Sequence, residues 1–64
     1  MTRSERRNWI TNIESSAATV ESQLGSATVN FVFERYGAHG IEDLNPSDLP
    51  EVFSDLYAIK ADLG

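Results

Sequence analysis

Apolar residues recur at helical spacing in the last third of the chain. Successive members are 3, 4, 3 and 4 residues apart, so all of them lie on one side of an α-helix. We name this set the C-terminal seam, and it consists of Leu49, Val52, Leu56, Ile59 and Leu63. Phe53 and Tyr57 flank the seam and widen it into a band that can face a core. The pattern predicts a helix over residues 49–63.

The residues just before this helix carry the signals of a helix start. Pro50 suits the first turn, where its missing N–H group would have no partner, and it disfavours helical φ and ψ angles at Leu49. Asp48 and Glu51 have the spacing of a capping box. Asn45–Pro46 is typical of a turn or a single helical turn. We therefore expect a short helical turn to lead into the last helix.

The same spacing occurs near the N-terminus. Thr2 and Glu5 form a capping-box pattern, and the apolar residues after them predict a helix over residues 4–24. The N-terminal seam consists of Ile10, Ile13, Ala17, Val20 and Leu24. Serine and threonine residues in its middle lower helix propensity, so a break there stays open. Two such seams favour packing together, either within one chain or between chains.

A shorter helix is expected between the two seams. Gly25 can take the left-handed position that ends a helix, and Ser26 can cap the next one. The following apolar residues share one helical face, which predicts a helix over residues 27–36: Val29, Val32, Phe33 and Tyr36. Gly37 ends this helix, and Phe31 points away from its apolar face. The fold class is therefore all-α, a small three-helix bundle in a single domain, residues 1–64.

The size and composition of the chain limit its stability. The core of a 64-residue chain rarely supplies more than about 3–5 kcal/mol of folding free energy unless a disulfide, a metal or oligomerisation adds to it. The chain has no cysteine for a disulfide, and its single histidine cannot build a tetrahedral zinc site. Oligomerisation or a partner is therefore the expected source of additional stability. No apolar run reaches the roughly 20 residues of a membrane span, and the N-terminus lacks the apolar core of a signal peptide. We expect a cytoplasmic protein.

Charge is unevenly distributed along the chain. Residues 1–13 contain three arginines and one glutamate, a net of +2, and the remainder contains nine acids and two basic residues, a net of −7, which sum to −5. Between residues 42 and 55 there are five acids and no base: Glu42, Asp43, Asp48, Glu51 and Asp55. This field disfavours direct binding to nucleic acid and to anionic membranes. It predicts a docking surface for a basic protein, or else ordinary solubilising charge.

The residue types that carry catalysis or bind metal are sparse. A serine nucleophile needs a positioned base, and the single histidine, His39, lies between glycines on an expected exposed loop. A calcium loop counted from Asp43 would need glycine at its sixth position and glutamate at its twelfth, where this chain has Asp48 and Ser54. We therefore expect no enzyme activity, no cofactor and no metal. Trp9 and Phe31, beside the apolar faces, are candidate anchors for a protein partner or else part of the core.

One part of the chain resembles a known group of proteins. The residues concerned are Tyr36–Gly37, the run IEDLNP at residues 41–46, EVF at 51–53 and LYAI at 56–59. From about residue 25 onward the chain resembles short, acidic, uncharacterised proteins carried on mobile elements of Gram-positive bacteria. The resemblance excludes residues 1–13, and it implies a phage or plasmid accessory protein without naming an activity. That class includes inhibitors of host CRISPR or restriction nucleases, some of which are acidic mimics of nucleic acid.

Two functional hypotheses follow from the sequence. The first is a non-enzymatic protein-binding module, in its specific form an anti-CRISPR or anti-restriction inhibitor that binds a basic partner through its acidic residues. The alternative is a homo-oligomeric assembly protein, such as a homodimer, whose two seams pair between chains.

Overall fold

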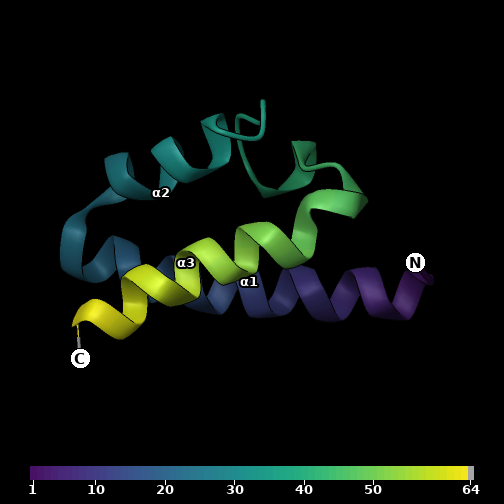
Figure 1. Cartoon of the computed structure of the whole chain (residues 1–64), viewed down its shortest axis with the longest axis horizontal. Coiled ribbons are helices and arrows are strands. Elements are labelled where there is room, and N and C mark those ends of the chain that lie inside the picture. The colour runs from purple at the N-terminus through teal and green to yellow at the C-terminus, as the bar shows by residue number, and fades with distance from the viewer. Residues whose placement is uncertain (64) are drawn as a thin grey trace.

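The structure is a computed structural model that describes residues 1–63, and these residues form an all-α bundle of three helices (Figure 1). In chain order the elements are α1 (Arg3–Leu24), α2 (Ser26–Glu34), the 3-10 turns η1 (Ile41–Asp43) and η2 (Pro46–Asp48), and α3 (Leu49–Leu63). The predicted fold class is thus confirmed, including the short helical turn before the last helix.

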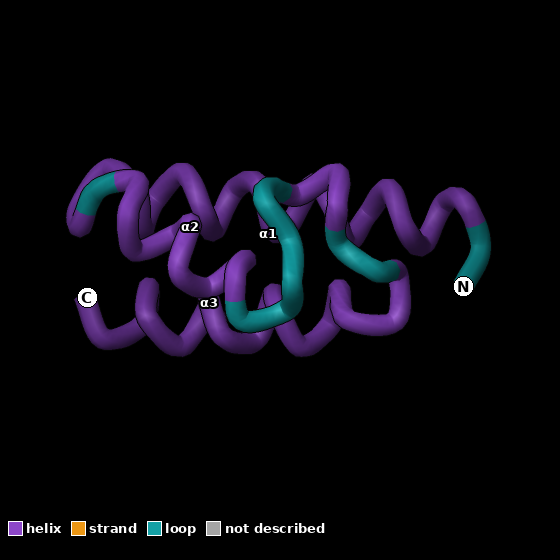
Figure 2. Tube along the Cα trace, turned by 90° about the horizontal axis from the view of Figure 1, so that it is seen from above, coloured by secondary structure: helices purple, strands orange, loops and turns teal. Residues whose placement is uncertain are grey.

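The three helices alternate in direction. α1 and α3 run side by side in the same direction, and α2 runs in the opposite direction over one face of this pair (Figures 1 and 2). The connection over residues 35–48 returns the chain to the end of the bundle where α1 begins, so α3 can follow α1 along its length (Figure 1). The most extensive contacts are between α1 and α3.

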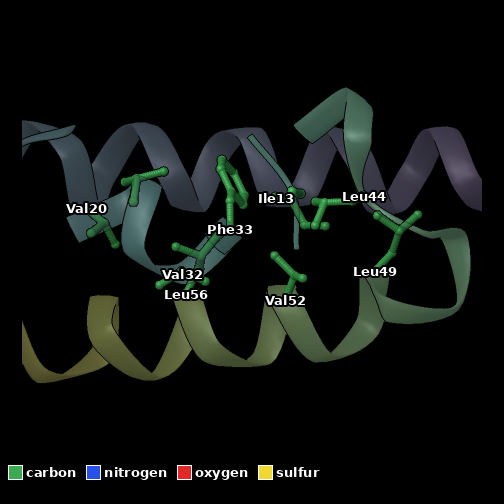
Figure 3. Close-up of a cluster of buried hydrophobic side chains, with 10 residues drawn as sticks. Ile13, Val20, Val32, Phe33, Leu44, Leu49, Val52 and Leu56 are labelled. Atoms are coloured by element: carbon green, nitrogen blue, oxygen red, sulfur yellow. The ribbon is translucent and has the colours of Figure 1, made fainter. Parts of the chain in front are cut away.

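The core lies where all three helices meet. Both seams point into it, and residues of α2 and of the following connection close it from one side (Figure 3). Its buried members are Ile13, Val20, Val29, Val32, Phe33, Ala38, Leu44, Leu49, Val52 and Leu56. The ends of the seams lie outside this core, since Leu24 is 48% exposed and Leu63 is 40% exposed. The two seams therefore pack against each other within one chain.

The first helix is continuous and begins one residue before its predicted start. Thr2 is its N-cap, because the Thr2 hydroxyl accepts a hydrogen bond from the backbone N–H of Glu5 at 3.1 Å. The helix does not break in its serine-rich middle, where Ser16 is buried with 3% exposure. Burial of the seam on either side of Ser16, at Ile13 and Val20, outweighs the low propensity of the intervening residues.

A single glycine separates the first two helices. Gly25 has φ +90° and ψ 166°, and its N–H donates to the Glu21 carbonyl at 2.8 Å. The expectation that Ser26 caps the next helix is wrong, because Ser26 is already the first residue of α2. One residue of connection leaves no position for a separate cap.

The end of α2 is a Schellman motif around Gly37, which has φ +74°. The N–H of Ala38 donates to the carbonyl of Phe33 at 3.1 Å, and the N–H of Gly37 donates to the carbonyl of Glu34 at 3.0 Å. These bonds tighten the last turn, so the regular α-helix ends at Glu34, two residues before the predicted end. The predicted role of Gly37 as the residue that ends the helix is confirmed.

The start of α3 corrects two expectations. Asn45 caps η2 by accepting a hydrogen bond from the Ser47 N–H at 3.0 Å, as expected of a helical turn. Leu49, however, has helical angles, φ −55° and ψ −46°, although Pro50 follows it. Its burial (1% exposed) and the direct run from η2 into α3 outweigh the pre-proline preference. Asp48 is the last residue of η2, so it is not the N-cap that the capping-box spacing predicted.

Candidate functional site

The five carboxylates that the sequence singled out lie on three consecutive elements. Glu42 and Asp43 belong to η1, Asp48 to η2, and Glu51 and Asp55 to the first two turns of α3. These elements form the connection beyond α2 and the beginning of the last helix (Figure 1). We call these five residues the acidic segment, and the structure divides them by what each carboxylate contacts.

Asp55 holds the end of α2 against α3. Its carboxylate accepts a short hydrogen bond from the Tyr36 hydroxyl, and Arg35 Nη1 lies 3.9 Å from the same oxygen. The hydrogen bond to Asp55, together with burial and the negative charges of Asp55 and Glu51, raises the pKa of Tyr36 to about 12. Asp55 is therefore engaged within the fold, and a change at this position would alter packing as well as charge.

Asp43 is set apart by a hydrogen bond and Asp48 by partial burial. The Asp43 carboxylate accepts a hydrogen bond from the His39 backbone N–H at 3.3 Å, which shapes the connection after α2. Asp48 is half-buried at the end of η2. The two remaining residues, Glu42 and Glu51, are exposed, and neither forms an ion pair within residues 1–63. They are the carboxylates of the acidic segment that are most free to meet a partner.

The aromatic candidates have different environments. Trp9 is half-buried and packs edge-on against Phe53, with ring centroids 5.7 Å apart and an interplanar angle of 61°. The ring centroids of Phe53 and Tyr57 are in turn 5.9 Å apart, and Tyr57 is 56% exposed. Trp9 thus has a partner within the chain. Phe31 points outward as predicted and is 64% exposed, so it is the stronger of the two candidate anchors.

Two open grooves on the outer side of α1 were not found from the sequence. The first has a volume of about 460 Å³ and is lined by Arg3, Arg6, Arg7, Ile10, Thr11 and Glu14. The second, of about 290 Å³, lies between α1 and α2 and is also bordered by Ile41 of η1. Its other lining residues are Glu14, Ala17, Ala18 and Glu21 of α1 and Val29, Asn30 and Phe33 of α2. The signal that could have found them is a second set of helically spaced residues on α1, at positions 3, 7, 10, 14, 17 and 21.

The described part of the chain offers no assembled metal site. Among residues 1–63, no three aspartate, glutamate or histidine side chains come close enough together to hold an ion. His39 is exposed in the connection after α2, where the sequence placed it. In the same residues no helix combines the length and the apolar character needed to cross a membrane.

The contact between Tyr36 and Asp55 predicts a pH dependence of stability. The folded state holds the Tyr36 proton up to a pKa of about 12, whereas the unfolded chain releases it near pH 10, so this contribution is complete below pH 10. It should be lost as the pH rises from about 10 to about 12. The measurement is the denaturation midpoint between pH 8 and 12 for the wild type and for Tyr36→Phe. The difference between their profiles should shrink over this range, whereas Tyr57→Phe should follow the wild type. A pH-independent difference for Tyr36→Phe would contradict the assignment.

Comparison with known proteins adds no information on the fold or the function of this chain. No protein-family model, curated protein or solved structure matches the chain. The resemblance to mobile-element proteins therefore stays a prediction.

Proposed function

We propose that the chain is a non-enzymatic module that binds a basic protein partner through its acidic segment. The observation that carries this proposal is the state of Glu42 on η1 and Glu51 on α3, which are both exposed and lack counter-ions within residues 1–63. Arg35, which is 3.9 Å from Asp55, is the single basic group paired with the segment in those residues. Most of the negative charge of the acidic segment is thus not neutralised within residues 1–63, so it can attract an external partner.

Charge of this kind acts mainly on recognition and on the rate of association. Carboxylates at the rim of an interface steer a basic partner and disfavour acidic ones, and salt screens their attraction. Binding energy also requires apolar anchors, and Phe31 is an exposed aromatic side chain on the neighbouring helix. The acidic segment supplies charge and Phe31 supplies an exposed aromatic side chain, which are the two kinds of group that a protein interface uses.

The specific form of the proposal is an inhibitor of a nucleic-acid enzyme of the CRISPR or restriction type. A groove that binds phosphates is lined by arginine and lysine, so a row of carboxylates can occupy it in place of nucleic acid. What supports this form is the charge of the acidic segment and the resemblance of residues 25–64 to proteins of mobile elements.

The test is affinity capture with the tagged protein from a lysate of its native host, at low and at high salt, with bound proteins identified by mass spectrometry. We expect one enriched nucleic-acid enzyme with a basic groove at low salt, and its loss at high salt because screening weakens the charge attraction. Capture that is equally strong at both salt concentrations would contradict a charge-driven interface, as would recovery of the bait's own untagged copies alone.

A further inference from the structure

The outer side of α1 carries charges that oppose the dipole of its own helix. Arg3 and Arg6 lie in its first turn with Glu5, where the positive helix end disfavours cations, and Arg7 follows in the second turn. Glu21 lies in its last turn, where the negative end disfavours anions. Arg3 and Arg7 are also four residues apart, so their like charges repel each other. Within residues 1–63 none of these side chains forms an ion pair that would offset the cost.

These charges belong to a regular stripe along the helix. Its members are spaced 4, 3, 4, 3 and 4 residues apart, which is the spacing of a helix–helix seam. We call it the outer stripe, and it consists of Arg3, Arg7, Ile10, Glu14, Ala17 and Glu21. It shares Ile10 and Ala17 with the N-terminal seam, but its four charged residues lie to one side of that seam, and both grooves on α1 open along it. Its first half is basic and its second half is acidic, with small or apolar residues between.

We propose that the outer stripe binds a second copy of this chain, with the two α1 helices antiparallel. In the register where residue numbers of opposing positions add up to 24, Arg3 lies opposite Glu21 of the second copy, and Arg7 lies opposite its Ala17, between its two carboxylates. The two-fold axis repeats each contact, so the stripe is self-complementary. A parallel arrangement places arginine against arginine and glutamate against glutamate, so the charges select the antiparallel one.

The grooves provide room for this contact. The arginine side chains of one copy would lie over Ala17 and Ala18 of the other, where small residues leave space for a long side chain beside the wall of α2. Their guanidinium groups would then reach Glu14 and Glu21, which are exposed. The antiparallel dimer brings cations to the negative end of each helix and anions to the positive end, so it offsets the unfavourable placement within each chain.

The outer stripe shares Ile10 and Ala17 with the N-terminal seam, and its second groove is bordered by Ile41 at the start of η1. The two hydrophobic seams are used inside the chain, and the acidic segment lies on η1, η2 and α3. Neither Glu42 nor Glu51 lines the two grooves, so the proposed dimer contact does not use these two carboxylates.

The test measures mass by sedimentation equilibrium over dilution from about 1 mM. Four chains are compared: the wild type; Arg3→Glu with Arg7→Glu, whose stripe is entirely acidic; Glu14→Lys with Glu21→Lys, whose stripe is basic at all four charged positions; and the chain with all four changes. The fourth chain has the net charge of the wild type, −5. Its two Arg→Glu changes lower the net charge by 4, and its two Glu→Lys changes raise it by 4. The new charges at positions 3 and 21 favour the helix dipole, so circular dichroism should show that the three variants fold as the wild type does.

We expect the wild type to approach the mass of a dimer and each two-site variant to dissociate, with a dissociation constant raised by at least about tenfold. The four-site variant should recover dimerisation, since its inverted stripe is again self-complementary. An equimolar mixture of the two two-site variants should also form a dimer. A wild-type mass of one chain at every concentration would overturn the proposal, and so would a four-site variant that stays monomeric.

Discussion

Replacing Leu56 with alanine is expected to unfold most of the protein at 25 °C. Leu56 is fully buried (0% exposed) in the contact of α3 with the other helices. Removal of a buried leucine side chain costs about 2–5 kcal/mol, because it loses apolar contacts and leaves a cavity. A core of this size rarely supplies more than about 3–5 kcal/mol. The measurement is thermal and urea unfolding followed by far-ultraviolet circular dichroism.

The chain offers a matched control in the same seam and the same helix. Leu63 is 40% exposed, so Leu63→Ala should change the free energy of unfolding by no more than about 0.5 kcal/mol. Equal losses for the two variants would contradict the burial that separates the centre of the seam from its end. A dimer held by paired seams predicts a different result, in which Leu63→Ala also lowers the dimer's stability at low protein concentration.

The second large effect is expected at the joint between α1 and α2. Gly25 has φ +90° and ψ 166°, a region that residues with a side chain almost never adopt. Gly25→Ala should therefore lower the free energy of unfolding by about 1–3 kcal/mol. Apart from Gly25 and its two neighbours in the chain, no residue has an atom within 4 Å of the position that the new Cβ would take, so the cost comes from the local backbone conformation and not from a clash with the packed helices.

Gly40 is the control for this prediction. It has φ −173°, an extended conformation that any residue adopts, and a Cβ there would also meet no atom within 4 Å. Gly40→Ala should leave the urea midpoint nearly unchanged. If Gly25→Ala also left the urea midpoint unchanged, the backbone geometry of the one-residue connection between α1 and α2 would be wrong.

The helices could be predicted because the seams repeat over several turns. Five apolar residues at alternating intervals of 3 and 4 specify both the helix and its buried side, as in residues 49–63. Positive-φ glycines were also predictable, since Gly25 and Gly37 each follow an apolar helical run. The errors occurred where local preferences competed with packing. Leu49 is helical despite Pro50, and Ser26 begins a helix that it was expected to cap.

The candidate site was less predictable than the fold. Composition identified the acidic segment. It could not reveal that Asp55 accepts a hydrogen bond from the Tyr36 hydroxyl, since these residues are 19 positions apart in the sequence. It also could not distinguish Trp9, which packs on Phe53, from Phe31, which faces solvent. The outer stripe of α1 was hidden because its spacing is occupied by charged and small residues, which a search for apolar periodicity passes over.

The central claim is that Glu42 and Glu51 carry recognition of a basic partner. Capture of the enriched lysate protein by two double variants tests it most directly: Glu42→Lys with Glu51→Lys, and Glu14→Lys with Glu21→Lys. Each variant changes the net charge from −5 to −1 (−5 + 4), so the pair differs in the position of the charge and not in its amount. We predict that the first variant loses the partner and the second retains it. Equal capture by both variants, or loss by the second alone, would contradict the claim.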